Sequence, residues 1–355
     1  MEEKIFEFLK KFADSPSPSG FEVPAQRVWR EHVTPHADKV ETDVMGNTWG
    51  VVEGKKRPRV MLAGHADEIG LMVTYIDENG FCSFATIGGI DSHLMPGKRV
   101  AVHGPAGAVP GVIGRKPIHL LEAEERTKVS KVKELFIDLG AADKAAAEAL
   151  VSVGDPVTFV DGLDRLQGEN VVGRGFDDKI GSMIVAEVLR RVARKKKKLN
   201  CTVYGVSTVQ EEVGLRGAKA SAYSIDPEIG ICVEVTFATD HPGADKKSVG
   251  DVALGKGPVL SRGANINHKL FDMLKAVAKK EEIPLQFEAA PRATGTDANV
   301  MQLSRSGVAT ALVEIPLRYM HTSGEVLNLT DVENAIKLIC AFLLKLTGKE
   351  SWIPD

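Results

Sequence analysis

The chain has 355 residues, of which 43% are hydrophobic, and this is enough to bury one large core and a second, smaller one. Its 45 basic and 48 acidic side chains leave a formal net charge of −3, so the composition favours neither nucleic acid nor an anionic membrane as a partner. The N-terminus lacks the pattern of a secretion signal, no apolar run approaches the roughly 18 residues of a spanning helix, and the 4 cysteines have no paired spacing. We therefore expect a soluble, cytoplasmic protein with reduced thiols.

The first elements along the chain are predicted to be two helices. Apolar side chains recur at helical spacing over Glu2–Ala13, a break rich in proline and serine covers Ser15–Gly20, and a second helix is expected around Val23–His36. Beyond them, helical patterns at Lys179–Arg194 and Leu270–Lys280 alternate with short apolar runs. These runs are Arg59–Ala63, Asn200–Thr208, Ile229–Val235 and Val308–Pro316. Such alternation predicts an α/β fold in which a mixed, largely parallel sheet is sandwiched by helices.

Residues 69–163 follow a different pattern. Leu71–Asp77 and Phe81–Ile87 flank Glu78-Asn79-Gly80, a strong hairpin signal because asparagine and glycine both tolerate positive φ. Short strands punctuated by glycine and proline follow. We therefore predict a small β-rich domain that is inserted into a larger, discontinuous α/β domain. The larger domain would consist of residues 1–68 and 164–355.

The last helix is predicted from the residues at its start. Thr330 and Glu333 have the spacing of a capping box, in which a hydroxyl and a carboxylate satisfy each other's free backbone N–H groups. An apolar stripe then continues to Leu346. We expect this helix to begin with Thr330 as its cap.

Acids and histidines stand at the ends of four apolar runs. His65, Glu234 and His321 follow three of them, and the adjacent Glu211 and Glu212 come just after the fourth. The carboxyl ends of neighbouring parallel strands meet at one edge of an open sheet, which is where such folds place their sites. We therefore expect these side chains to converge on one polar site.

Two further acids, Asp177 and Asp178, open the helix that runs to Arg194. Taken alone, acids in a first helical turn merely complement the helix dipole, and a single histidine after a strand is more often structural. Taken together, these residues supply the nitrogen and oxygen ligands of a dinuclear hydrolytic metal site, with one carboxylate to bridge two ions and another acid left free as a base. Asp67, two residues after His65, is placed to hold that imidazole through its other N–H.

A series of short segments extends nearly from one end of the chain to the other. The segments are Ser17-Pro18-Ser19-Gly20-Phe21-Glu22, His65-Ala66-Asp67-Glu68-Ile69-Gly70, Ile87-Gly88-Gly89, Phe176-Asp177-Asp178-Lys179, Val209-Gln210-Glu211-Glu212-Val213-Gly214, Gly295-Thr296-Asp297-Ala298 and Pro316-Leu317-Arg318-Tyr319-Met320-His321-Thr322. In this order they resemble the cytosolic dinuclear metallo-aminopeptidases of the tetrahedral aminopeptidase, cellulase M and glutamyl aminopeptidase family. The resemblance implies a fold like that of other zinc peptidases.

The resemblance also implies two divalent metal ions per subunit, with zinc or cobalt as the first choices and manganese as the third. One ion would be held by His65, Asp177 and Glu234. The other would be held by Asp177, Glu212 and His321, so that Asp177 bridges the pair.

The same resemblance implies how the reaction proceeds. Glu211 would be the general base, taking a proton from a bridging water and returning it to the leaving amine, while Asp67 would orient His65. The substrates would be peptides that lose their N-terminal residues. Residues 69–163 would form a dimerisation domain, and the dimers would assemble into a hollow dodecamer.

The chain departs from the family pattern at two places. Glu234 stands where an aspartate is usual. Asp178-Lys179 replaces the Asn-Arg pair that commonly follows the bridging aspartate. Two consequences of the added negative charge are open: Lys179 neutralises it, or it alters the metal preference of the site.

Three other functions remain open at this point. A carboxypeptidase, dipeptidase or deacylase would use the same metal site, with Arg292 or Arg318 binding a substrate carboxylate. A glucan hydrolase would use paired carboxylates, and a metal-binding scaffold would need no free base. The preferred N-terminal side chain is also open, because loops shape the pocket that selects it.

Overall fold

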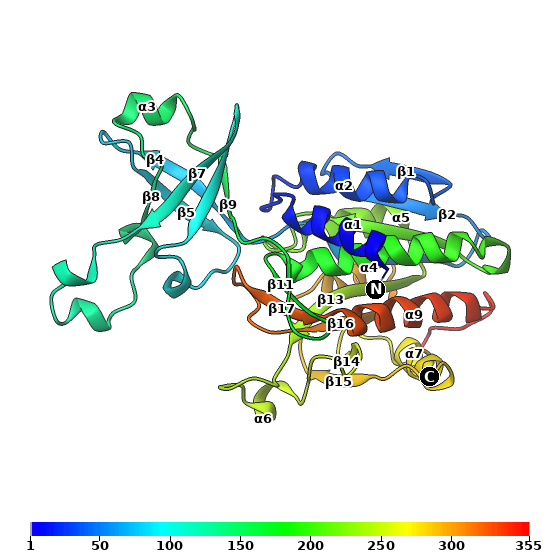
Figure 1. Ribbon diagram of the computed structural model, residues 1–355. Coiled ribbons are helices and arrows are strands. Elements are labelled where there is room, and N and C mark those ends of the chain that lie inside the picture. Colours follow the sequence, from blue (N-terminus) through cyan, green and yellow to red (C-terminus); the bar gives the residue numbers. More distant parts are fainter. Residues whose placement is uncertain (1, 355) are drawn as a thin grey trace.

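The computed structural model describes residues 2–354, which form a large α/β body and a smaller barrel beside it (Figure 1). An eight-stranded sheet runs through the large body in the order β1-β2-β12-β3-β13-β16-β14-β15. Its strands are β1 (Lys39–Thr42), β2 (Thr48–Val52), β3 (Arg59–His65), β12 (Thr202–Thr208), β13 (Ile229–Phe237), β14 (Val259–Gly263), β15 (Gln286–Ala290) and β16 (Ala309–Leu317). The strands β12, β3, β13 and β16 are parallel neighbours, whereas β2 and β14 pair with them in the antiparallel sense. The predicted mixed sheet is therefore confirmed.

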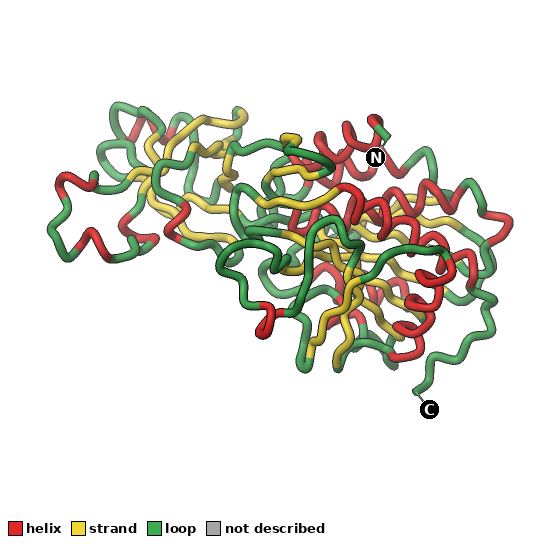
Figure 2. Tube along the Cα trace, turned by 60° about the horizontal axis from the view of Figure 1, so that its bottom comes forward, coloured by secondary structure: helices red, strands yellow, loops and turns green. Residues whose placement is uncertain are grey.

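Helices pack along the strands of the large body, as the tube in Figure 2 shows. They are α1 (Glu3–Asp14), α2 (Val23–Val33), α4 (Phe176–Ala193), α5 (Arg216–Ile225), α7 (His268–Lys280), α8 (Ala298–Met301) and α9 (Leu329–Lys345). The short α6 (Lys246–Val249) lies apart from the sheet, in the loop after β13 (Figure 1). The central helix is α4, which packs on β3, β12 and β13 and against α9. Apolar side chains on all of its sides, among them Ile180, Met183 and Val188, are fully buried, as expected for a helix that is surrounded by other elements.

The strand β3 and the helix α4 approach each other closely at two glycines. A Cβ atom on Gly64 would collide with the backbone of Gly181 and Ser182, and one on Gly181 would collide with the carboxylate of Asp178. Only glycine fits at these positions. The contact brings the end of β3, with His65, next to the first turn of α4.

The barrel lies between β3 and α4 in the chain and consists of strands and loops with several short helical segments (Figure 2). It closes in the order β4-β5-β8-β7-β6-β9 around its own core, which includes Leu71, Phe84 and Ile137. Its elements are β4 (Gly70–Ile76), β5 (Cys82–Ile87), β6 (Arg99–Gly104), β7 (Gly107–Gly114), β8 (Phe136–Asp138), α3 (Lys144–Glu148) and β9 (Pro156–Phe159). The β-rich insert is thus confirmed, while the division at 68/69 and 163/164 stays a prediction.

The predicted hairpin is formed by β4 and β5, but its turn differs from the expected one. Gly80, with φ of 84°, takes a positive φ there, whereas Asn79 does not. The side chain of Asp77 accepts hydrogen bonds from the backbone N–H groups of Asn79 and Phe81, both at 2.9 Å, and so closes a longer loop.

A separate three-stranded sheet, β10-β11-β17, leads into α9. Its strands are β10 (Asp164–Arg165), β11 (Asn170–Gly173) and β17 (Glu325–Asn328). The predicted capping box at the start of α9 is wrong, because Asn328 caps the helix by accepting the N–H of Thr330 at 2.9 Å. Glu333 instead binds Arg191 through two bonds of 2.8 and 2.7 Å, a stronger interaction than a reciprocal cap.

Within residues 2–354, no helix combines the length and the apolar character that crossing a membrane requires. All four cysteines are free thiols, and Cys82, Cys201 and Cys232 are buried in apolar surroundings.

Candidate metal centre

Four parallel strands bring the predicted site residues to one edge of the large sheet. His65 is the last residue of β3, Glu211 and Glu212 lie in the turn after β12, and His321 follows the end of β16 by four residues. The apolar pattern predicted that Glu234 follows the end of its strand. It lies instead within β13, three residues before the end of that strand. Asp177 enters from the first turn of α4.

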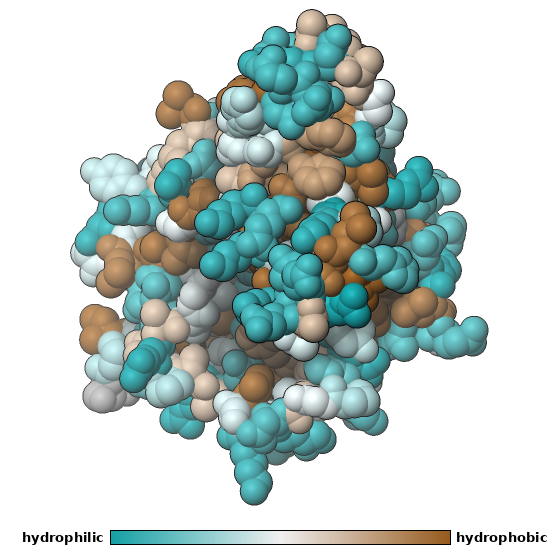
Figure 3. All heavy atoms as spheres, turned by 90° about the vertical axis from the view of Figure 1, so that its left-hand side faces the viewer, coloured by the Kyte–Doolittle hydropathy of each residue, from teal (hydrophilic) through white to brown (hydrophobic). Residues whose placement is uncertain are grey.

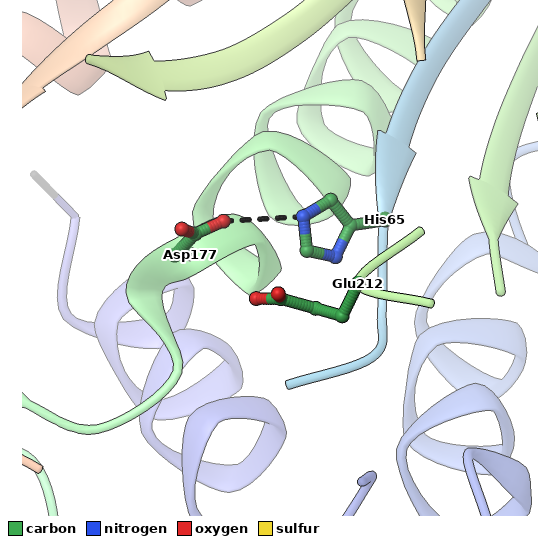
Figure 4. Close-up of side chains that lie close together, drawn as sticks. All are labelled: His65, Asp177 and Glu212. Atoms are coloured by element: carbon green, nitrogen blue, oxygen red, sulfur yellow. Dashed lines mark hydrogen bonds and ion pairs between the residues drawn. The ribbon is translucent and has the colours of Figure 1, made fainter. Parts of the chain in front are cut away.

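The carboxylate of Asp177 lies between two imidazoles. Its Oδ1 is 3.1 Å from Nε2 of His65, and its Oδ2 is 3.2 Å from Nε2 of His321. Glu212 points into the same space (Figure 4), with Oε1 at 3.4 Å from Nε2 of His321. His65, Asp177 and Glu212 offer ligand atoms that all lie within 4.8 Å of one another, so they could hold a metal ion together.

A second group of this kind consists of His65, Asp178 and Glu234. It contains Asp178 where the prediction has Asp177. Both oxygens of Asp178 already accept backbone N–H groups, from His65 at 3.1 Å and from Gly181 at 2.9 Å. The side chain of Asp178 therefore fixes the contact between β3 and α4, while Asp177 faces both imidazoles.

The expected neutralisation of Asp178 by Lys179 is wrong. The Lys179 ammonium donates to Glu68 at 3.0 Å and to the carbonyl of Ser15 at 2.7 Å. The Lys179 ammonium is thus bound by groups other than Asp178. Burial raises the pKa of Asp178 well above its ordinary value.

Burial and mutual repulsion govern the protonation of the other acids. Burial raises the pKa of Glu211 to about 9, and Asp297 and Asp177 add to the effect. Burial, with Asp177 nearby, likewise raises the pKa of Glu212 to about 7. The pKa of Glu234 is also raised well above its ordinary value by burial and by Asp178.

The pKa of Asp177 moves in the opposite direction. Burial alone would raise it, but hydrogen bonds from His321 and His65 outweigh burial and lower it. The hydrogen bond between His321 and Asp177 also raises the pKa of His321 to about 9, against the effect of burial.

Three buried carboxylate oxygens at this edge have no hydrogen-bond partner: Oε1 of Glu212, Oε2 of Glu234 and Oδ1 of Asp297. Among the described residues, the only side chains within ion-pair distance of the carboxylates of Asp177, Glu211, Glu212 and Glu234 are the two histidines. Burying an ionised carboxylate without a positively charged partner costs free energy, and a bound metal ion would remove this cost. Carboxylate oxygen and imidazole nitrogen are the ligands of zinc and similar divalent ions, so the residues present fit such ions.

Backbone carbonyls orient both imidazoles. Nδ1 of His65 lies 3.0 Å from the carbonyl oxygen of Asp67, and Nδ1 of His321 lies 2.8 Å from that of Gly89. A carbonyl oxygen only accepts, so Nδ1 carries a hydrogen in each ring, and Nε2, which faces Asp177, is the nitrogen that would bind a metal ion after losing its own proton.

The carboxylate of Asp67 has a task that the sequence did not indicate. It accepts the backbone N–H groups of Glu211 at 3.0 Å and Glu212 at 3.1 Å, and the hydroxyl of Ser19 at 2.6 Å. Its Oδ1 is farther, at 3.4 Å, from Nδ1 of His65. The backbone of Asp67 thus holds the ring, and its side chain holds the turn that carries both glutamates.

Two residues near the centre escaped the sequence analysis. Glu325 accepts the backbone N–H of Asp177 at 3.2 Å and that of His321 at 3.0 Å, and its carboxyl is buried. Asp297, quoted above without a role, is fully buried and accepts the hydroxyl of Thr208 at 2.6 Å. The only sequence signal for Glu325 was its position as an acid at the start of a short apolar strand.

The arginines considered for binding a substrate carboxylate differ in their surroundings. Arg318 makes two bonds of 2.8 and 2.7 Å to Asp240, so its guanidinium is already paired. Arg292 is exposed on a loop. His241, in the loop after β13, lies with its ring 5.5 Å from that of Tyr319.

Solved structures share this architecture over their full length. A TET aminopeptidase from the marine sediment archaeon Thaumarchaeota archaeon SCGC AB-539-E09 has a TM-score of 0.93 and 37% identity, with 97% of each chain covered. The Pyrococcus horikoshii TET1 peptidase, described as assembling into a tetrahedron or a large octahedral shell, has a TM-score of 0.87 and 33% identity over 96% of this chain and 100% of its own. The fold is thus that of the TET peptidases.

The amino-acid sequence narrows this class to one family. The pattern of the M42 glutamyl aminopeptidases matches residues 46–338. A lysyl aminopeptidase of Pyrococcus furiosus is 39% identical over 344 residues, which cover 96% of this chain and 97% of the relative. The chain belongs to the M42 glutamyl aminopeptidase family and is a peptide hydrolase, which confirms the resemblance stated above.

Proposed function

We propose that this protein is an aminopeptidase with a dinuclear metal centre, which removes N-terminal residues from peptides by means of a bridging water. The observation that carries the proposal is the arrangement of Asp177, whose two oxygens face His65 and His321 separately. His65, Asp177 and Glu234 would hold one divalent ion. Asp177, Glu212 and His321 would hold the other, and zinc, cobalt and manganese all suit these ligands.

The bound ions would supply Lewis acidity, polarising the peptide carbonyl and lowering the pKa of water. The chain's own base is Glu211. Its Oε2 lies 3.9 Å from Nε2 of His65, and its side chain is 11% exposed, so it reaches the centre without belonging to either group of ligands. It takes a proton from the attacking water and returns it to the leaving amine. Asp67 holds the backbone of Glu211 in place during both transfers.

The charge of the site supports action on free N-termini. Its uncompensated groups are carboxylates, which attract the ammonium of a peptide N-terminus. Arg318, a group that would bind a C-terminal carboxylate, is already paired with Asp240. Both features favour an aminopeptidase over a carboxypeptidase acting at the same centre.

We also propose that the protein is cytoplasmic and assembles through residues 69–163 into dodecamers built from dimers. Figure 3 shows hydrophobic side chains between hydrophilic ones on the face of the molecule that includes the barrel. Large hydrophobic side chains in the proposed dimerisation domain are strongly exposed, among them Ile118 at 61%, Leu120 at 65% and Val153 at 63%. Exposed apolar groups of this kind mark surfaces that partners cover.

One panel of substrates tests the proposed function. Protein stripped of metal and reloaded with zinc, cobalt or manganese is assayed on aminoacyl amides with a free N-terminus, on N-blocked peptides with a free carboxyl group and on a soluble glucan. We expect cleavage of the amides alone, and only after reloading. Failure of every ion to restore cleavage of any amide would overturn the proposal. Cleavage of the N-blocked peptides, or metal-independent cleavage of the glucan, would favour one of the other two hydrolases.

A further inference from the structure

The two imidazoles at the centre depend on different parts of the chain. The carbonyl that orients His65 belongs to Asp67, which directly follows β3 in the large body. The carbonyl that orients His321 belongs to Gly89, two residues beyond β5 of the barrel and 232 positions away in the chain. The barrel therefore takes part in the geometry of one imidazole and not of the other.

The segment Gly88-Gly89 also lies directly against the ligands on that side. A Cβ atom at residue 88 would lie 3.0 Å from Oε2 of Glu212 and 2.8 Å from Cγ2 of Ile69. A Cβ atom at residue 89 would have only the imidazole of His321 within 4 Å, with Nδ1 at 3.4 Å. Two successive glycines thus let the barrel backbone touch both Glu212 and His321.

The two sides of the centre differ in how firmly the rest of the fold holds them. The backbone N–H groups of both histidines are bound by buried carboxylates, that of His65 by Asp178 and that of His321 by Glu325. The side chain of His65, however, is only 1% exposed. The side chain of His321 is 37% exposed, and it stands in a loop where its own φ is 60°. A half-exposed ring on a loop has more freedom to rotate, so the contact with Gly89 decides more of its orientation.

We propose that Gly88-Gly89 is a positioning segment through which the barrel sets the affinity of one of the two metal sites. The inference rests on the proposed function, in that Glu212 and His321 are taken as ligands of the same ion. The ion held by Asp177, Glu212 and His321 depends on this segment. The ion held by His65, Asp177 and Glu234 shares Asp177 with that site, but neither His65 nor Glu234 contacts the segment, so its affinity should change much less.

The decisive variant is Gly88→Ala, studied as the full chain. Stripped protein is titrated with Zn²⁺ by calorimetry, which yields two dissociation constants. Groups that orient metal ligands typically contribute about 10- to 100-fold to affinity, so one constant should weaken by at least about 10-fold and the other should stay within about 2-fold. Gly89→Ala, whose methyl group meets the imidazole at an ordinary contact distance, should weaken the same constant by less.

Gly97→Ala is the matched control. Gly97 lies in the same part of the chain and has φ of 84°, close to the 74° of Gly88, but a Cβ atom there would have nothing within 4 Å. This variant carries the same backbone strain and should leave both constants unchanged. His321→Ala and His65→Ala, titrated alongside, identify which constant belongs to which side.

The outcomes separate the inference from the proposed function. Unchanged constants in Gly88→Ala, or an equal loss in both, would overturn the inference even if the wild type cleaves aminoacyl amides. Two ions bound by a wild type that cleaves no amide would overturn the proposed function instead. If circular dichroism shows that Gly88→Ala does not fold, Gly89→Ala decides alone, because it has no left-handed φ to strain, and unchanged affinities in it would contradict the proposal.

The double variant Gly88→Ala with Ile69→Ala distinguishes two ways in which Gly88→Ala could act. The second substitution removes the closer of the two collisions and leaves the one with Glu212. A persistent loss of affinity for one ion supports the positioning of Glu212. Full recovery would show that the loss came from the displaced Ile69, and would contradict the proposal.

Discussion

Two buried groups of charges lie beside each other in this protein, and they are built on opposite plans. Asp67 and Glu68 are neighbours in the chain, yet Glu68 faces a cluster that contains its own cations. Its carboxylate binds the guanidinium of Arg174 and the ammonium of Lys179, together with the backbone N–H of Ser17 at 2.9 Å. Burial would raise the pKa of Glu68, but the two cations outweigh burial and lower it to about 2.

The candidate metal centre has buried carboxylates as well, but among the described residues no lysine or arginine lies within ion-pair distance of them, only the two histidines. Glu211, Glu212 and Glu234 have raised pKa values, and two of their oxygens have no hydrogen-bond partner. The comparison teaches that burial of charge does not by itself mark a functional site, since the cluster at Glu68 is equally buried and serves the fold. What marks the site is charge that the chain leaves uncompensated.

The largest expected effect is that of Glu211→Gln on catalysis. Removing a general base typically costs about 10²- to 10⁴-fold in rate, and the amide cannot take a proton from water. We expect the loss in kcat for an aminoacyl amide, with KM and zinc content little changed, because Glu211 belongs to neither group of ligands. A rate within a few-fold of wild type would contradict the role given to Glu211. The measurement is steady-state cleavage together with metal analysis of the same sample.

The elements of the fold were largely predictable from the sequence because their signals are local. The parallel strands β13 and β16 are covered on both faces, so they read as continuous apolar runs. The prediction of how α9 begins was wrong because it depended on a residue that is distant in the sequence. Thr330 and Glu333 had the pattern of a cap, but Asn328 was an equally good cap, and the choice depended on Arg191, which is distant in the sequence.

The candidate ligands follow the same division. Residues that end strands could be proposed from the sequence, since topology alone brings the carboxyl ends of neighbouring strands together. The carbonyl of Gly89 could not, because a backbone atom has no signature in the sequence and its partner is 232 residues away. The two bonds of Glu325, across 148 residues to Asp177 and four to His321, depend in the same way on the finished fold.

Lys179→Met should destabilise the buried cluster of Glu68, Arg174 and Lys179. The variant leaves Glu68 with one cation in place of two, and removing a partner from a buried ion pair costs about 3–5 kcal/mol. We expect that loss in the free energy of unfolding from urea titrations of metal-free protein. Lys10→Met, at an exposed ion pair with Asp14, is the control and should change stability by less than about 1 kcal/mol. Equal effects of the two substitutions would mean that the cluster is not a structural unit.

Glu212→Gln should change the free energy of unfolding of metal-free protein in the opposite direction, that is, it should stabilise the fold. The folded-state pKa of Glu212 is raised from 4.5 to about 7, so its ionisation disfavours the fold above pH 7 and does not below pH 4.5. At pH 8 the amide should therefore stabilise the metal-free protein by about 3 kcal/mol. Addition of zinc should reverse the order, because wild type gains a ligand that binds only the folded state. Destabilisation in both conditions would show that Glu212 is paired in a way that the charge argument omits.

Glu314 in β16 is a buried acid that belongs to neither group of charges. We expect its substitution to have the smallest effect on stability of those considered. Burial raises its pKa from 4.5 to about 8, the carboxylate of Glu288 adds to this, and a hydrogen bond from Ser261 opposes it. A group whose folded pKa is raised loses stability as the pH rises from the unfolded pKa through the folded one. Between pH 7 and 8.5, wild type should thus lose about 1 kcal/mol relative to Glu314→Gln, measured as the difference between their unfolding free energies.

The matched control for this last experiment is Glu7→Gln, at an exposed position of α1, which should show the same pH dependence as wild type. A wild-type curve parallel to that of Glu314→Gln over this range would mean that Glu314 is ionised throughout and has a cation that the fold supplies. In that case, an acid without an ion pair would no longer be sufficient to distinguish the metal centre from the rest of the core. If the curves diverge as expected, Glu314 is neutral at pH 7 and needs no cation. The fold then uses a cation of its own for one buried acid and a proton for another, and the proposed metal ions would be a third solution.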